Sequence, residues 1–124
     1  PIFLDRIASG RPITVLGDGS ATRDFVHVDD VARMIAATVD RPASHAVYNV
    51  GSGEATPLGR VIELCAEVAG HPVTIERGVE PSTFVHRSVL DIARAVDEFG
   101  VAPVIGLREG IERTWAERSA GERP

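Results

Sequence analysis

The chain has 124 residues, of which 44% are hydrophobic and 25% are charged, a composition typical of one ordinary globular domain. Its formal net charge of −5 argues against non-specific nucleic-acid binding, which needs a basic surface. The sequence has no run of about 18 hydrophobic residues and no secretory leader pattern, so we expect neither a membrane span nor export. The single cysteine, Cys65, excludes an internal disulfide and fits a cytoplasmic protein.

Hydrophobic spacing and turn residues predict short strands that alternate with amphipathic helices, which indicates the α/β class. A helix over residues 1–9 ends at Gly10 and has no convincing N-cap, so we expect the chain to lack an N-terminal part. Residues 12–20 predict a strand that runs into a Gly-Asp-Gly turn, and residues 23–28 predict a second strand. We expect a single partial domain over residues 1–124.

The middle of the chain predicts two further helices and a strand. The first of these helices should begin at Asp29 as its N-cap and bury one face, formed by Val31, Met34, Ile35 and Val39. Residues 45–53 predict an apolar strand that ends in Gly-Ser-Gly. Thr56 should then cap a helix with Pro57 at its first position. That helix should end at Gly70 and bury a stripe formed by Leu58, Val61, Ile62, Cys65 and Val68.

The last third predicts two extended segments, over residues 72–76 and 86–91, and two helices. Asp91 should cap the first helix, which ends at Gly100 and carries Ile92, Val96 and Phe99. Residues 106–120 predict a final amphipathic helix on which three hydrophobic residues stand at a spacing of four: Leu107, Ile111 and Trp115. We expect the residues after Ala120 to fray.

Two glycine pairs follow predicted strands, as a dinucleotide-binding loop would. The fingerprint also requires a third glycine, and its two expected positions hold Thr22 and Thr56. A tight turn is therefore the favoured interpretation of Gly17 and Gly19. For Gly51 and Gly53, a loop beside a ligand and a plain loop both remain open.

Other catalytic and metal-binding patterns find little support. Asp24, Asp29 and Asp30 could indicate a metal together with His27, but strand alternation should separate Asp24 from His27, and Asp29 is explained by helix capping. Cys65 lies in mid-helix and should belong to the core. The G-x-S-x-G pattern is absent, and all thirteen basic residues are arginine, so mechanisms that need a lysine are excluded within this chain. We assign no catalytic, metal or cofactor residue.

Arg23 is the strongest binding candidate, because it stands between a turn and a strand, where a side chain can reach a cleft. A guanidinium group suits bidentate contacts with phosphate. The alternative is an ion pair with a neighbouring acid, such as Asp24 or Glu54. Asn49, at the end of a predicted strand, could contact a ligand or only the adjacent loop.

Three motifs stand in a recognisable order: "GDGSATRDFVHVDDVA", "YNVGSG" and "SVLDIARAVDEFG". With their spacing, they resemble the C-terminal part of the extended short-chain dehydrogenase/reductase family, the NAD-dependent nucleotide-sugar epimerases and dehydratases. The resemblance covers essentially the whole chain. It implies the substrate-binding portion of a Rossmann-type fold, without the N-terminal NAD-binding half.

The resemblance also implies roles for individual residues. Arg23 matches the arginine that grips the nucleotide diphosphate, and Asn49 matches a residue beside the same phosphates. Thr14, Val15 and Leu16 match the segment along the base. The family's second phosphate arginine is absent, because residues 81–84 read Pro-Ser-Thr-Phe, and Arg77 or Arg87 could substitute for it.

The family's chemistry implies NAD(P) and a Tyr-x-x-x-Lys pair, in which the lysine lowers the pKa of the tyrosine. This chain has no such pair, since Ser52 stands four residues after Tyr48. We therefore expect a nucleotide-sugar-binding part that is not catalytically competent alone and that pairs with a missing NAD-binding half. The alternatives are a free-standing binding module and an inactive remnant whose exposed apolar surface drives homo-oligomerisation.

Overall fold

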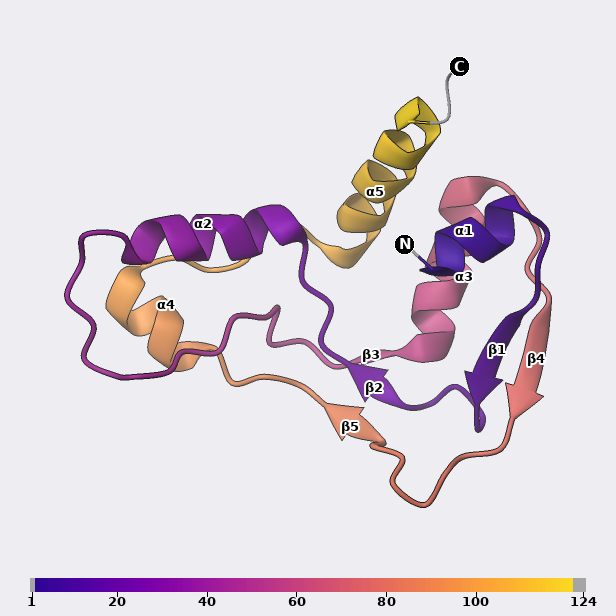
Figure 1. Cartoon of the computed structure of the whole chain (residues 1–124), viewed down its shortest axis with the longest axis horizontal. Coiled ribbons are helices and arrows are strands. Elements are labelled where there is room, and N and C mark those ends of the chain that lie inside the picture. Colours follow the sequence, from indigo (N-terminus) through magenta and orange to yellow (C-terminus); the bar gives the residue numbers. More distant parts are fainter. Residues whose placement is uncertain (1, 122–124) are drawn as a thin grey trace.

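A computed structural model describes residues 2–121 of the chain. The helices are α1 (Ile2–Ala8), α2 (Val28–Thr38), α3 (Leu58–Ala69), α4 (Ala93–Phe99) and α5 (Leu107–Gly121). The strands are β1 (Ile13–Leu16), β2 (Thr22–Arg23), β3 (Thr56–Pro57), β4 (Ile75–Gly78) and β5 (Arg87–Ser88). The predicted α/β class is confirmed (Figure 1). The prediction about the end of the chain concerns residues 121–124: Gly121 is the last residue of α5, and residues 122–124 lie outside the described residues.

The strands form two small sheets. In the first, β1 pairs with β4 in parallel, so that Ile13 lies opposite Ile75 and Leu16 opposite Gly78. In the second, β2 is central and pairs antiparallel with β3 and parallel with β5. Figure 1 shows that this second sheet joins two parts of the molecule. We call α1, β1, α3, β4 and α5 the larger lobe, and α2, α4 and the 39–50 loop between them the smaller lobe.

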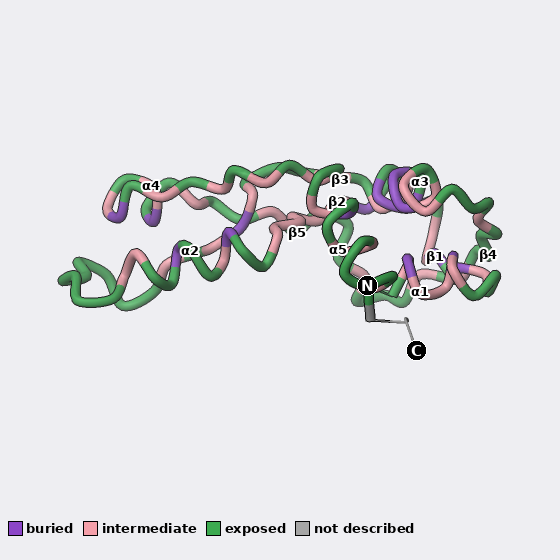
Figure 2. The backbone as a smooth tube through the Cα atoms, turned by 90° about the horizontal axis from the view of Figure 1, so that it is seen from above, coloured by how far each residue is buried: buried purple, intermediate pink, exposed green. Residues whose placement is uncertain are grey.

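Each lobe has its own hydrophobic core (Figure 2). In the larger lobe, α3 packs against both α1 and α5, and the buried residues are Leu4, Ile7, Ile13, Val15, Val61, Ile62, Leu64, Cys65 and Ile111. The predicted burial of Ile111, with Leu107 and Trp115 packed around it, is confirmed. In the smaller lobe, α2 packs against α4, and the buried hydrophobic residues among those described are Met34, Ala95 and Phe99.

The glycine signals in the sequence are confirmed at the helix ends. Gly70 and Gly100 are the C-caps of α3 and α4, and both adopt the left-handed conformation that glycine tolerates best. Gly17 and Gly19 also have positive φ values, of 68° and 83°, and form the turn that follows β1. The interpretation of this pair as a tight turn is therefore confirmed.

Several boundaries differ from the sequence prediction. The N-cap of α2 is His27 and not Asp29, because the Nδ1 atom of His27 accepts the N–H of Asp29 at 3.2 Å. Thr56 does not cap α3. Thr56 lies in β3, where it pairs with Arg23 of β2, and Pro57 takes the N-cap position of α3. Asp91 stands one residue before the N-cap of α4, although its carboxylate does accept the N–H of Ala93.

Two predicted strands are shorter or absent. The strand predicted over residues 23–28 is reduced to β2, because the chain leaves the sheet once the N–H of Asp24 has bonded to Ser88. Residues 45–50 form no strand. Tyr48 packs instead on Phe99, with the ring centroids 4.9 Å apart, so the apolar residues of this segment cover a helix.

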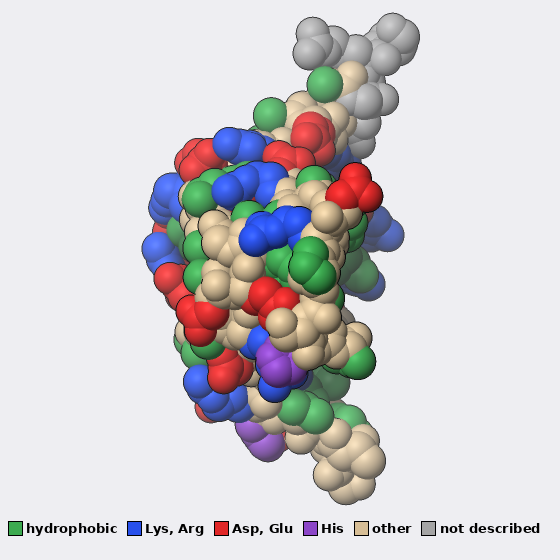
Figure 3. All heavy atoms as spheres, turned by 90° about the vertical axis from the view of Figure 1, so that its left-hand side faces the viewer, with side chains coloured by type: hydrophobic (Ala, Val, Ile, Leu, Met, Phe, Trp, Pro, Cys, Tyr) green, Lys and Arg blue, Asp and Glu red, His purple; other side chains and the backbone are tan. Residues whose placement is uncertain are grey.

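The predicted buried face of α2 is only partly correct. Met34 is buried, but Ile35 and Val39 are 60% and 61% exposed. Figure 3 views the molecule from the end where α2 and α4 lie, and shows hydrophobic side chains interspersed with acidic and basic ones. Within the smaller lobe, α4 thus covers one side of α2, and another side of α2 stays exposed.

Candidate functional site

Arg23 lies at the end of β2, in the sheet that joins the two lobes, opposite Thr56 of β3 and Ser88 of β5. Its Nη1 atom donates to the carbonyl of Thr22 at 2.8 Å, and its guanidinium lies 5.7 Å from the centroid of the Phe84 ring. In the part of the chain that the structure describes, no acid forms an ion pair with Arg23. The ion-pair alternatives, Asp24 and Glu54, are therefore not realised.

Phe84 belongs to a compact loop that closes one side of Arg23. The N–H of Phe84 donates to the carbonyl of Pro81, and the ring meets His86 edge-on at 5.2 Å. The Nε2 atom of His86 lies 3.6 Å from a carboxylate oxygen of Glu80. An aromatic ring thus contacts Arg23 from residues 81–84, the stretch where the resemblance implies an arginine.

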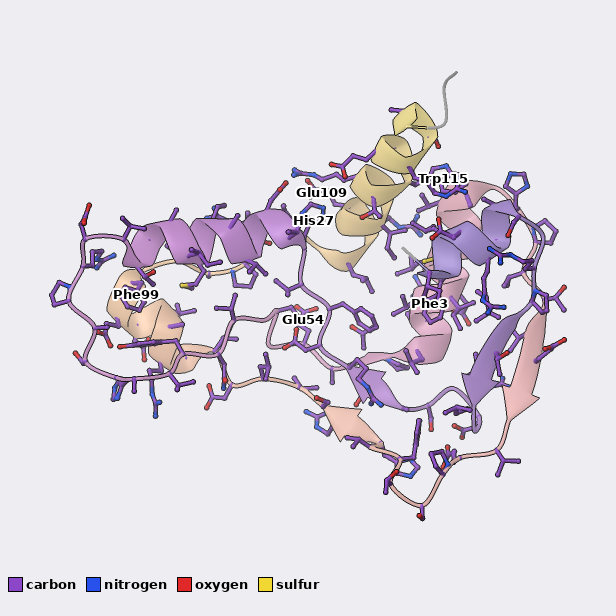
Figure 4. All side chains as sticks on the ribbon, in the orientation of Figure 1. Phe3, His27, Glu54, Phe99, Glu109 and Trp115 are labelled. Carbon is purple, nitrogen blue, oxygen red and sulfur yellow. The ribbon has the colours of Figure 1, made fainter. Side chains whose placement is uncertain are left out.

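A cavity of about 440 Å³ opens beside Arg23. It is bounded by α1, α3, α5 and the segment before α2, and in Figure 4 Phe3 and His27 lie on either side of the lower end of α5. Its lining is mainly hydrophobic and includes Phe3, Phe25, Leu58, Val61, Leu107 and Ile111. Among the described residues that line it, Arg23 is the one with a permanent charge. The arrangement combines an apolar recess with a single cation, a combination that suits an anionic ligand with a bulky uncharged part.

The segment predicted to lie along a base is β1, and its side chains alternate. Thr14 is exposed, Val15 is buried in the core, and Leu16 is half-buried. Arg77 stands opposite Val15 on β4, and its Nη1 atom donates to the carbonyl of Gly17 at 3.2 Å. Thr14 and Leu16 therefore share one face of this sheet, whereas Arg77 lies on the other face with Val15 and is bonded at the glycine turn. Val15 is buried, so it has only its backbone to offer a ligand.

The structure places Asn49 and Arg87 less favourably than Arg23. The side-chain amide of Asn49 donates to the carbonyl of Asp91 at 3.1 Å, so one of its donors is already used. Arg87 stands opposite Thr22 on β5, while Arg23 stands opposite Ser88. Because paired residues share a face of a sheet and successive residues alternate, Arg87 and Arg23 leave opposite faces. Of the two substitutes predicted for a second phosphate arginine, Arg87 is thus directed away from the face of Arg23, whereas Arg77 lies in the other sheet and is bonded to the glycine turn.

The space against two of the glycines is filled by acidic side chains. A Cβ atom on Gly17 would collide with the carboxylate of Glu80, and one on Gly51 would lie 2.6 Å from an oxygen of Asp24. A dinucleotide pyrophosphate needs backbone N–H groups at such glycines and repels carboxylates. The described residues therefore do not fit the NAD pyrophosphate at either turn.

The acidic residues once considered for a metal serve other purposes. Asp29 forms an ion pair with Arg113 of α5, and Asp30 accepts the N–H groups of Val104 and Ile105. Between residues 2 and 121, no three histidine, cysteine or acidic side chains come together as metal ligands. Within the same residues, no helix is both long enough and apolar enough to cross a bilayer.

Asp24 is a feature that the sequence interpretation missed. Its two carboxylate oxygens accept four hydrogen bonds, from the N–H and hydroxyl of Ser52 and from the N–H groups of Gly53 and Leu90. Burial raises the pKa of the Asp24 carboxyl, but these hydrogen bonds outweigh it and hold the pKa below its ordinary value. The only sequence signal was an aspartate next to the candidate arginine, which suggested a pair with that arginine.

Comparison with known proteins gives a consistent result. Residues 1–51 match the model of the "NAD dependent epimerase/dehydratase family". A UDP-glucose 4-epimerase from Corynebacterium glutamicum is 35% identical over 114 residues, which cover 86% of this chain and 33% of that protein. A dTDP-glucose 4,6-dehydratase from Actinoplanes is 32% identical and covers 94% of this chain and 37% of its own length.

Solved structures agree with this. The UDP-glucose 4-epimerase of Thermus thermophilus in complex with NAD superposes with a TM-score of 0.86 at 31% identity, over 98% of this chain and 40% of that one. The Thermotoga maritima UDP-glucose 4-epimerase with UDP-glucose gives a TM-score of 0.85 at 27% identity, over 96% of this chain and 39% of that one. The chain therefore spans about a third of the length of the curated relatives it matches.

Proposed function

The chain belongs to the NAD-dependent epimerase/dehydratase family, and we propose its function from that premise. In this proposal it is the C-terminal, nucleotide-sugar-binding part of an enzyme that interconverts nucleoside-diphosphate sugars. Its relatives include UDP-glucose 4-epimerases and dTDP-glucose 4,6-dehydratases, so the ligand is a UDP- or dTDP-linked sugar.

The observation that carries the proposal is the set of contacts around the Arg23 guanidinium. Its guanidinium has no carboxylate partner among residues 2–121, is held by the carbonyl of Thr22 and the ring of Phe84, and borders the 440 Å³ cavity. A half-buried cation of this kind binds a diphosphate more strongly than an arginine in full solvent, because water screens the interaction less.

The remaining residues complete a binding surface around Arg23. Thr14 and Leu16 contact the base through side chain and backbone, and Val15 contributes its backbone. Arg77, fixed at the glycine turn, supplies the second cation that residues 81–84 no longer provide. Asn49 and Arg87 have lesser roles, because one is already bonded to Asp91 and the other leaves the opposite face of the sheet.

The reaction itself falls outside this chain. NAD(P) and the tyrosine–lysine pair belong, in this proposal, to another part of the protein, since the sequence holds no lysine and its glycine turns are filled by carboxylates. A cytoplasmic location is also proposed, because Cys65 is a buried free thiol. The second candidate is a free-standing nucleotide-sugar-binding module, which the same Arg23 site favours equally.

Titration calorimetry with UDP tests the proposal. Replacing Arg23 by alanine removes a charge-assisted contact of about 1.5–3 kcal/mol, so affinity should fall on the order of 10- to 100-fold. Arg60→Ala is the matched control, because Arg60 lies on α3 and pairs only with Glu63 and Glu67. Equal affinities of wild type and Arg23→Ala, or the absence of UDP binding by the wild type, would overturn the proposal.

A further inference from the structure

We propose that Asp24 is a positioning residue of the Arg23 site, whose carboxylate fixes the segments that carry Arg23 and Asn49 relative to each other. The inference rests on the proposed function and adds a residue to which the resemblance gave no role. It concerns how the site is held, since both carboxylate oxygens of Asp24 are bonded to the chain and Asp24 acts through its neighbour Arg23.

Both oxygens of the Asp24 carboxylate accept hydrogen bonds from other residues of the chain. Oδ1 accepts the N–H of Ser52 at 2.6 Å and its hydroxyl at 2.7 Å. Oδ2 accepts the N–H of Gly53 at 3.0 Å and the N–H of Leu90 at 3.2 Å. One side chain thus binds two backbone segments that are far apart in the sequence, and both lie beside the sheet that carries Arg23.

Gly51 shows how closely the loop approaches this carboxylate. Gly51 is buried, and a Cβ atom at this position would lie 2.6 Å from Oδ2 of Asp24, closer than real Cβ atoms come to their neighbours. A side chain at position 51 would push the carboxylate or the loop away. The "GSG" stretch, whose role the sequence left open, is therefore explained by the approach to Asp24.

The carboxylate joins its own segment and the two that it binds, and candidate ligand contacts lie on or beside two of these three. Arg23 directly precedes Asp24, and Asn49 stands two residues before Gly51. Leu90 directly precedes Asp91, whose carbonyl accepts the side-chain amide of Asn49. If the carboxylate is lost, β2, the 51–53 loop and the segment before α4 lose their common anchor, and Arg23 and Asn49 no longer have a fixed separation.

The anchor requires a charged carboxylate. An ionised aspartate offers two acceptor oxygens, and all four partners are donors. Asparagine would keep one oxygen and direct an NH₂ group at N–H donors, leaving some of them without an acceptor. The lowered pKa of Asp24 agrees with a carboxylate that stays ionised near neutral pH.

The experiment combines UDP calorimetry with amide hydrogen exchange in the whole chain. Asp24→Asn should weaken UDP binding about tenfold and speed exchange at Ser52, Gly53 and Leu90. Gly51→Ala should produce both effects with Asp24 still present. Asp40→Asn is the matched control: Asp40 is an exposed aspartate just after α2, in a left-handed conformation that asparagine tolerates, so neither measurement should change.

Two further readouts separate positioning from a general loss of structure. Exchange in the α3 core, at Val61, Ile62 and Cys65, should stay unchanged in Asp24→Asn. In an Arg23→Ala background, Asp24→Asn should weaken UDP binding much less than it does in the wild type, because the two residues act through the same contact. A merely structural role would give the same fold-change in both backgrounds.

The outcomes are distinguishable from failure of the proposed function. If the wild type binds UDP and Asp24→Asn binds it equally well, the positioning role is wrong and the proposed function stands. Unchanged exchange at Ser52, Gly53 and Leu90 in Asp24→Asn would also overturn it. If the wild type does not bind UDP, the proposed function fails first, and the positioning role fails with it.

Discussion

The two lobes differ in what holds them together. The larger lobe buries nine hydrophobic residues contributed by α1, β1, α3 and α5, whereas the smaller lobe buries three. The smaller lobe compensates with polar contacts. Arg41 donates to the carbonyls of Glu98 and Phe99 at the end of α4, and Tyr48 donates to the carboxylate of Glu98. Figure 4 shows Phe99 at the far end from Trp115, so the two cores are well separated.

This difference shows which contacts set stability and which set geometry. Burial of hydrophobic side chains is the main stabilising contribution, so the larger lobe should dominate the free energy of unfolding. The smaller lobe and the central sheet depend on single buried or half-buried carboxylates, namely Asp30 and Asp24. Removing one such carboxylate should loosen a segment without unfolding the whole chain.

The largest effect is expected in the larger core. Ile62 is 1% exposed, so Ile62→Ala leaves a cavity and should lower the free energy of unfolding by about 2–5 kcal/mol, measured by chemical denaturation. Phe99→Ala is the matched test in the smaller lobe. It should speed amide exchange in α2, α4 and the 39–50 loop while α3 stays protected. A loss of protection in α3 would contradict the separation of the two cores.

An intermediate effect is expected at Asp30, which is 3% exposed, pairs with Arg33 and accepts the N–H groups of Val104 and Ile105. Asp30→Asn should cost about 1.5–3 kcal/mol, because hydrogen bonds to a charged group are lost. Burial raises the pKa of Asp30, but the hydrogen bonds from Ile105, Val104 and Arg33 prevail and lower it below the ordinary value.

This lowered pKa fixes the sign of the pH dependence. The stabilisation by Asp30 is fully present above the pKa of an unfolded aspartate and is lost as the pH falls through the lower folded value. Denaturation of wild type and Asp30→Asn between pH 7 and pH 2 should therefore show two curves that converge in acid, on the order of pH 4 and below. A constant difference over this whole range would contradict the role given to the charge.

The smallest effect is expected on the open side of α2. Ile35 is 60% exposed, so Ile35→Ser should change the free energy of unfolding by no more than about 0.5 kcal/mol. The neighbouring Met34→Ser serves as its counterpart and should be clearly destabilising, since Met34 is buried against α4. A large loss of stability in Ile35→Ser would show that this side of α2 is covered in solution.

The same contrast explains which elements could be predicted. The helix over residues 58–69 was predictable because its hydrophobic residues repeat at helical spacing and Gly70 ends it. Residues 45–50 were misassigned because an apolar run fits a strand and a helix-covering segment equally well, and only the partner decides. The boundary of α2 shifted because a histidine, an uncommon cap, supplies the acceptor that Asp29 was expected to supply.

The site could be predicted only where a residue's own chemistry identified it. Arg23 was predicted from its type and its place after a turn, and Thr14 and Arg77 were predicted through the resemblance; these assignments stay predictions. Asp24 was missed because its partners, Ser52 and Leu90, lie 28 and 66 residues away in the sequence. Contacts at such separations leave no local pattern, so they become visible only in the folded chain.

The measurement that tests the central claim most directly is an NMR titration of the isotope-labelled chain with UDP. The account predicts shift changes that saturate with UDP and are concentrated at Thr14, Leu16, Arg23 and Arg77, with a smaller change at Asn49 and none over residues 39–47 of the smaller lobe. Absence of shift changes, or changes confined to the smaller lobe, would contradict the assignment of a nucleoside-diphosphate site to Arg23.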